Sequence, residues 1–299
     1  MYTKQDRRMQ LFAHMILILI TIIAILPFVL LVMVSLTDND TAIAEGYRFW
    51  PSKFSLDAYE YIIDEWSTIG RAYGVTIFVT IIGTAGSLIV SSMFAYALSH
   101  KDLPGRKLLT FLVVFTMLFN GGIVSSYFIY TNVFNIKNTI FALLIPNLFM
   151  SAFNLILLRN YFETNIPSAL LEAANIDGAG EWILFIKIVI PLSLPILATV
   201  GLITAIGYWN DWTNGLYFLN DRDGSHLYSI QNVLNRINEN INFLANNSSQ
   251  LGMRTDASQL PTTTMRMAIA VVGILPIMVF YPFFQKYFVK GITIGSVKE

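Results

Sequence analysis

Long apolar stretches constrain this chain more than any other feature of its sequence. A helix needs about 20 largely apolar residues to cross ~30 Å of hydrocarbon. Only 13% of the residues are charged, against about 25% in soluble domains. The sequence therefore predicts an all-helical membrane protein with about six transmembrane helices. The six predicted spans are 11–36, 73–98, 108–130, 140–158, 190–219 and 267–284.

Basic residues beside the spans predict which side of the membrane each loop faces, because cytoplasmic loops are enriched in Lys and Arg. Placing the N-terminus inside puts most basic residues in the cytoplasm and most acidic residues outside. We therefore expect both termini to be cytoplasmic. The predicted parts are a cytoplasmic N-terminus at 1–10, a first helix at 11–36, an external segment at 37–72, a core of five helices at 73–290 with an external loop at 220–264, and a cytoplasmic tail at 291–299.

The residue types give little indication of an enzyme active site. The chain has no cysteine, which excludes thiolate metal sites and a cysteine nucleophile, and its three histidines are widely separated. No Gly-rich phosphate loop ends in Gly-Lys-Ser or Gly-Lys-Thr, so another polypeptide would have to hydrolyse ATP. A net charge of zero gives no indication of nucleic-acid binding. We predict no catalytic residue, cofactor or metal.

The spans contain almost no ionisable groups, and this bears on whether transport is coupled to an ion gradient. Asp211 is the one acidic residue within an apolar stretch. Carriers that use an ion gradient usually need ionisable groups near the bilayer midplane. An ion-coupled secondary transporter is therefore disfavoured, and an intramembrane enzyme lacks paired catalytic groups.

The segment 165–195, between the fourth and fifth spans, predicts two short helices. Pro167 suits the first turn of a helix, and Gly178 allows the backbone to reverse direction. Two adjacent alanines would seat closely in a cleft, and two carboxylates could pair with basic groups of a partner. An ordinary pair of interfacial helices is the alternative. The candidate contact residues are Glu172, Ala173, Ala174, Asp177, Gly178 and Ala179.

Within this segment the sequence resembles a known family. Glu172-Ala173-Ala174, Gly178, Ile188 and Pro191 match the EAA motif of permeases of binding-protein-dependent ABC importers, with Ile190 where Leu is usual. The resemblance implies the type I (MetI-like) importer fold in a bacterial cell membrane. It also implies that the segment docks in a cleft of the ATPase and couples nucleotide-driven closure to the permease. The implied partners are membrane lipid, a second permease subunit in a heterodimer, two cytoplasmic ATP-binding subunits and an external solute-binding protein.

Looser patterns resemble the smaller permease subunit of maltose and multiple-sugar importers. They lie at 46–59, 209–212 and 281–291, while 120–122 and 295–298 resemble an oligosaccharide and complex-polysaccharide branch. The resemblance implies a carbohydrate substrate, most simply an oligosaccharide. A permease for another solute is the alternative within the class. Val124-Ser125 replaces a proline usual in that branch, which leaves the local bend of the third span open.

Polar residues within the fourth and fifth spans are candidates for the substrate pathway. Amide, carboxylate and hydroxyl groups could bond sugar hydroxyls, and aromatic rings could stack on sugar faces. The alternatives are interhelical hydrogen bonds, an interfacial aromatic belt, or a site held mainly by the partner permease. The candidates are Asn147, Ser151, Asn154, Tyr208, Asp211, Trp212 and Asn214.

An amphipathic helix is predicted at 227–244, outside the membrane, with Asn232 away from its apolar face. That face could pack on the chain itself, lie in the lipid interface or meet a partner. We expect the helix to hold the polar loop 246–250 toward the solute-binding protein. The tail 290–299 is expected, by resemblance, to reach toward the ATPase.

Overall fold

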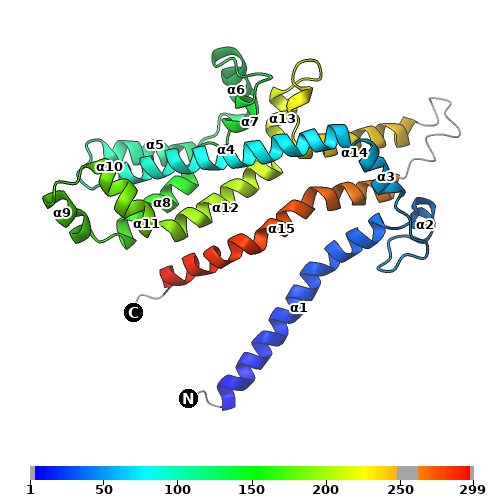
Figure 1. Cartoon of the computed structure of the whole chain (residues 1–299), viewed down its shortest axis with the longest axis horizontal. Coiled ribbons are helices and arrows are strands. Elements are labelled where there is room, and N and C mark those ends of the chain that lie inside the picture. Colours follow the sequence, from blue (N-terminus) through cyan, green and yellow to red (C-terminus); the bar gives the residue numbers. More distant parts are fainter. Residues whose placement is uncertain (1–3, 248–261, 297–299) are drawn as a thin grey trace. The chain divides into compact units, whose positions relative to one another are not determined.

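The computed structural model describes residues 4–247 and 262–296, and in these ranges the chain is helical with no named strand. An isolated bridge joins Thr37 and Phe54. The all-helical prediction is confirmed (Figure 1). The helices are α1 (Lys4–Ser35), α2 (Asn39–Glu45), α3 (Asp57–Asp64), α4 (Trp66–Ser99), α5 (Arg106–Leu118), α6 (Gly122–Phe128), the π-helix η1 (Ile129–Val133), α7 (Phe141–Leu144), α8 (Ala152–Asn165), α9 (Ser168–Ile176), α10 (Glu181–Leu184), the π-helix η2 (Phe185–Val189), α11 (Ile190–Leu192), α12 (Leu194–Asn210), α13 (Thr213–Phe218), the 3₁₀ helix η3 (Ser225–Leu227), α14 (Ile230–Asn247) and α15 (Thr262–Ser296).

The chain forms two compact units. The first comprises Met1–Ile69 with Leu234–Pro276, and the second comprises Gly70–Val233 with Ile277–Glu299.

Two helices are long and apolar enough to cross a membrane unaided. They are Met9–Ser35 within α1 and the whole of α4. Two bent pairs qualify if each counts as one span: Arg106–Leu118 with Gly122–Val133, and Glu181–Leu192 with Leu194–Asn210. By length and composition the described residues therefore hold two to four spans, and Thr263–Val279 in α15 is a shorter apolar helix.

The third predicted span is broken rather than continuous. The chain changes direction by 117° between its two helices. Gly122 at the break has φ 77°, and its N–H donates to Asn120 Oδ1 at 2.8 Å. A left-handed residue ends an α-helix, and glycine adopts that conformation at little cost. The bend that the sequence left open is therefore a sharp turn at this glycine.

The fourth predicted span is also not one helix. α7 ends at Leu144 and α8 begins at Ala152. Between them Pro146 cannot donate a backbone hydrogen bond, and Asn147 has φ 62°. The helix is thus interrupted at Pro146 and Asn147.

In the first unit, polar contacts fix the C-terminal end of α1 to α2 and α3. Asp38 accepts a hydrogen bond from Thr41 N at 3.2 Å and caps α2, and its other oxygen lies 3.1 Å from Lys53 Nζ. The hydrogen bonds from Thr41 and Lys53 hold the pKa of Asp38 below its ordinary value. The cap is therefore kept at neutral pH and lost as the pH falls through that lowered pKa. Ser35 and Tyr59 share a hydrogen bond of 2.7 Å.

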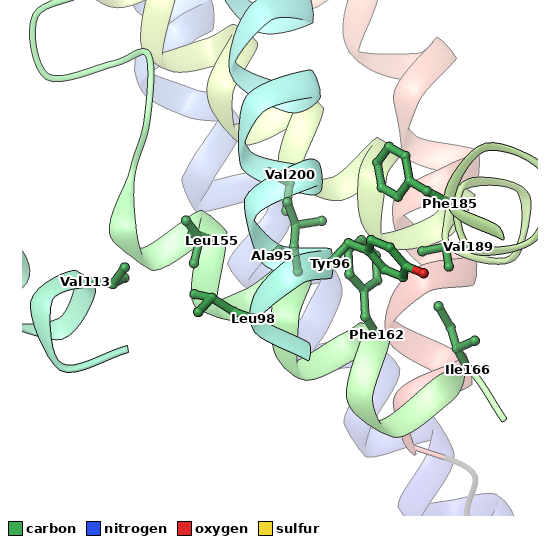
Figure 2. Close-up of a cluster of buried hydrophobic side chains, with 11 residues drawn as sticks. Ala95, Tyr96, Leu98, Val113, Leu155, Phe162, Ile166, Phe185, Val189 and Val200 are labelled. Carbon is green, nitrogen blue, oxygen red and sulfur yellow. The ribbon is translucent and has the colours of Figure 1, made fainter. Parts of the chain in front are cut away.

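In the second unit, a buried cluster joins the C-terminal half of α4 to α5, α8, η2 and α12 (Figure 2). Leu98, Leu158 and Val189 are fully buried in it. Burying one such side chain contributes about 1.5–3 kcal/mol relative to exposing it. Helices α9 and α10 lie beyond this cluster, at the end of the unit where α4 terminates (Figure 1).

Small residues four positions apart on α4 form a close helix contact in the second unit. Gly83, Ser87 and Ser91 are all buried. The ring of Tyr208 on α12 occupies the space where a side chain at Gly83 would lie. Small residues let two helices approach this closely.

The predicted outer helix exists as α14, and it is buried on more than its apolar face. Ile230, Val233 and Leu234 are buried as expected. Asn232 is also buried, because its amide donates to Trp212 O at 2.6 Å and its Oδ1 accepts from Ser229 Oγ at 2.7 Å. The helix continues to Asn247, and 248–250 of the predicted loop lie outside the described residues.

The predicted tail is largely helical. α15 continues to Ser296, and 297–299 lie outside the described residues.

Candidate functional site

The segment 165–195 forms the two short helices that the sequence predicts, joined by a tight turn. α9 ends at Ile176 and α10 begins at Glu181. Gly178 has φ 84°. Its N–H donates to Asn175 O at 3.0 Å, and Ala179 N donates to Ala174 O at 2.9 Å. These two bonds with a left-handed glycine between them form a Schellman motif, so the turn depends on the conformational freedom of Gly178.

The outer surface of α9 is uncovered. None of its residues is buried, and Ile176 is 86% exposed. Glu172, Ala173, Asp177 and Gly178 are exposed, while Ala174 and Ala179 are half-buried. Within the described parts of the chain neither Glu172 nor Asp177 has an ion pair. The two carboxylates and the side chain of Ile176 are therefore accessible on the surface of α9.

The same segment continues into α12 through a sharp bend. The helix direction changes by 80° between Glu181–Leu192 and Leu194–Asn210. Ser193 at the bend is fully buried, and its N–H donates to Val189 O at 3.0 Å. The chain therefore runs from the exposed turn to α12 over a short distance, through the buried bend at Ser193.

Three of the candidate pathway residues make interhelical hydrogen bonds. Asn154 Nδ2 on α8 donates to Thr204 Oγ1 on α12 at 3.1 Å. Tyr208 Oη donates to Leu144 O at 2.7 Å, and Asn214 Nδ2 donates to Pro146 O at 3.0 Å. All three side chains are at most 5% exposed. These contacts support the alternative that such residues hold the helices together.

Asp211 is also engaged within the chain. Its Oδ1 accepts hydrogen bonds from Thr213 N at 3.1 Å and Asn214 N at 3.3 Å. An Asp side chain bonded to the first N–H groups of a helix is an N-cap. Asp211 therefore caps α13 and makes the break between α12 and α13.

The remaining candidates are more open. Asn147 is exposed, Trp212 is 44% exposed and Ser151 is half-buried. The structure does not bring all seven candidates into one pocket. A hollow of about 200 Å³ lies instead between α4 and α10, lined by Met93, Tyr96, Glu181, Trp182 and Phe185. It is smaller than the ~300–1,000 Å³ usual for ligand pockets, so it does not suit an oligosaccharide.

The chain matches a family model over nearly its whole length. The match covers residues 6–294, and the model describes the binding-protein-dependent transport system inner membrane component. The chain belongs to this family. It is therefore a permease, the membrane-embedded part of a transporter, as the EAA motif implied.

Individual relatives agree with this family. The permease is 39% identical, over 98% of its length and 99% of the relative, to the polygalacturonan/rhamnogalacturonan transport system permease protein YtcP of Bacillus subtilis. It is 36% identical to Protein LplC of the same organism, over 92% of this chain and 90% of that protein.

A solved structure shows the same fold. It is a bacterial ABC transporter that imports the acidic polysaccharide alginate, with a TM-score of 0.75 and 29% sequence identity, and the match covers 96% of this permease and 99% of that chain. The type I importer fold is therefore confirmed. Permeases of this family work with a partner permease, ATP-binding subunits and a solute-binding protein.

Several structurally important residues were not found from the sequence. Arg106 and Glu163 form an ion pair, and Arg159 joins the same carboxylate at 3.0 Å. The spacing of Arg159 and Glu163 by four positions was the available signal. Nothing local indicated that Asn232 would bond Trp212 O.

The bond between Asn154 and Thr204 leads to a testable prediction. Thr204→Val should lower the melting temperature of the detergent-solubilised permease, because it leaves the buried Asn154 amide without its partner, at a cost of about 0.6–2 kcal/mol. Replacing both residues, with Asn154→Leu added, should recover most of the loss. A double variant that melts lower still than Thr204→Val would contradict this interpretation.

Proposed function

We propose that this permease imports an oligosaccharide and forms one half of the translocation pathway, with a second, similar permease as the other half. The observation that carries the proposal is the exposed Schellman turn with Glu172-Ala173-Ala174 before it and Gly178 within it. Two cytoplasmic ATP-binding subunits supply ATP hydrolysis, and an external solute-binding protein delivers the sugar.

In this proposal α9 is the element that docks in the ATPase. Ala173 and Ala174 form a surface with small side chains that seats closely in a cleft. Glu172 and Asp177 pair with basic side chains of the partner, since both carboxylates are exposed. The end of the permease that carries α9 faces the cytoplasm, as the distribution of basic residues indicates.

The sugar pathway is proposed to use the residues that the fold leaves open. Asn147 and Trp212 are exposed, and Ser151 lies between the break and the start of α8. Amides bond sugar hydroxyls and indole rings stack on sugar faces. Asn154, Tyr208, Asp211 and Asn214 then maintain the helices that form this pathway.

The proposed substrate rests on the relatives. The relative with 39% identity is named for polygalacturonan and rhamnogalacturonan, and the solved importer takes up alginate. Fragments of polygalacturonan are therefore the first substrates to test. A neutral oligosaccharide or another solute is the alternative.

Reconstitution of the complete transporter in proteoliposomes tests this function. The vesicles contain both permeases and both ATP-binding subunits, with ATP on the ATPase side and loaded binding protein on the other. We expect uptake of labelled oligogalacturonides that requires ATP and persists when ionophores collapse all ion gradients. Uptake without ATP that stops with the ionophores would establish an ion-coupled carrier instead. Uptake of other solutes only would overturn the substrate.

A further inference from the structure

Both ends of the coupling segment are fastened to the same turn of α4 by carboxylate side chains. The first contact precedes α9. Glu163, near the end of α8, accepts hydrogen bonds from Arg159 at 3.0 Å and 3.1 Å and pairs with Arg106. Arg106 Nε in turn donates to Leu98 O at 2.8 Å. Because these three charged side chains are only 18–23% exposed, solvent screens them less than a surface ion pair.

The second contact follows the turn. Tyr96 Oη on α4 donates to Glu181 Oε2 on α10 at 2.7 Å, and His100 Nε2 lies 3.9 Å from the same oxygen. The Tyr96 ring packs against Phe185 with centroids 5.2 Å apart. Figure 2 shows Tyr96 reaching from α4 toward Phe185 and Val189. A hydrogen bond to an ionised group is worth more than a neutral one, but the Glu181 side chain is 66% exposed, so solvent screens this bond more than the Glu163 pair.

α9 itself has no fully buried residue, and its Leu171 packs, partly buried, against the cluster of Figure 2. The anchors on either side therefore add to this one apolar contact in setting the position of α9. Tyr96 and Leu98 belong to one turn of α4, so both anchors hold the same short stretch of that helix. Force applied to α9 reaches α4 directly, in addition to the chain path through Ser193 into α12.

We propose that Glu163 and Glu181 are positioning residues that fasten both ends of the coupling segment to the last turn of α4. Through them, movement of α9 is passed to α4 instead of being absorbed by local bending. The inference rests on the coupling function proposed for α9. It goes beyond the docking surface, because none of the anchoring side chains lies on α9.

The test is a double-mutant cycle in the reconstituted complete transporter, with sugar transported per ATP hydrolysed as the readout. Tyr96→Phe and Glu181→Ala should each lower this ratio about threefold to tenfold, the range expected for one lost hydrogen bond. The double variant should be no worse than either single one. Glu181→Gln keeps an acceptor oxygen for Tyr96 and should retain most of the ratio, and Glu163→Ala should lower it through the other anchor.

Tyr161→Phe is the matched control. It also removes a phenol hydroxyl beside the coupling segment, but that hydroxyl is 3.4 Å from Leu192 O, which is a weak hydrogen bond. We expect a normal ratio in this variant. The KM for ATP should be unchanged in every variant, because no substitution touches the docking surface.

Two results would overturn the inference. One is an unchanged ratio in both Glu163→Ala and Glu181→Ala. The other is a parallel loss of assembly, ATP hydrolysis and uptake that leaves the ratio intact, which would mean that the anchors only stabilise the fold. ATP-independent uptake by the unmodified transporter would instead refute the proposed function, so the two failures are distinguishable.

Discussion

Replacing Gly178 by valine is expected to abolish most sugar uptake while leaving the permease in the membrane. Gly178 has φ 84°, and a β-branched residue in that region costs about 1–3 kcal/mol. An added Cβ would meet no atom within 4 Å, so the cost is in the backbone conformation and not in a steric clash. Each 1.4 kcal/mol of free energy changes an equilibrium constant by a factor of about 10. The population of the native turn should therefore fall several-fold to a hundredfold.

Two further variants, an asparagine at Gly178 and an alanine at Gly180, make this prediction specific. Gly178→Asn should retain far more uptake, because asparagine tolerates the left-handed conformation. Gly180→Ala should be nearly neutral, because Gly180 has φ −77° and open space at its Cβ position. Uptake and ATP hydrolysis are measured in the reconstituted transporter. Full uptake by Gly178→Val would show that the turn does not transmit the movement of the ATPase.

The coupling turn could be predicted from the sequence because its determinants are local. Pro167 and the alanine-rich stretch define one short helix, and Gly178 supplies the left-handed residue that a Schellman motif requires. All the hydrogen bonds of the turn join residues within five positions of one another. A pattern that spans so few residues can be recognised in the sequence alone.

The breaks in the apolar spans could not be predicted in the same way. Hydropathy reports only that a segment is apolar on average, and both 108–130 and 140–158 are largely apolar. Whether Gly122 and Asn147 adopt positive φ depends on what their neighbours contact. Leu144 O and Pro146 O, just before Asn147, accept from Tyr208 and Asn214, which are more than 60 residues away in sequence.

The roles of the polar residues also depended on distant partners. Asn154 and Asn214 were reasonable sugar ligands from their residue type, yet Asn154 donates to Thr204 on α12 and Asn214 donates to Pro146 O in the break between α7 and α8. Periodicity placed Asn232 away from the apolar face of its helix, yet Asn232 is buried because its amide donates to Trp212 O. A buried acceptor without a donor costs about 1–3 kcal/mol, which exceeds the preference of one asparagine for solvent.

The contact between Gly83 and Tyr208 leads to the largest expected effect on stability. An added Cβ at Gly83 would lie within 2.7 Å of three atoms of the Tyr208 ring. The ring cannot move away easily, because Tyr208 is only 2% exposed and its hydroxyl donates to Leu144 O at 2.7 Å. Close-packed interiors transmit such overlap as strain, and overpacking costs about 1–3 kcal/mol or more.

We therefore expect Gly83→Ala to lower the melting temperature of the solubilised permease markedly, and Gly83→Val to prevent assembly with the partner subunits. Gly74→Ala is the matched control on the same helix, because no atom lies within 4 Å of a Cβ at that position. Alanine is about 1 kcal/mol better than glycine within a helix, so this control should melt at the same temperature or slightly higher. Equal melting temperatures for Gly83→Ala and Gly74→Ala would show that α4 and α12 can separate without cost, and that the close approach at Gly83 does not define the fold.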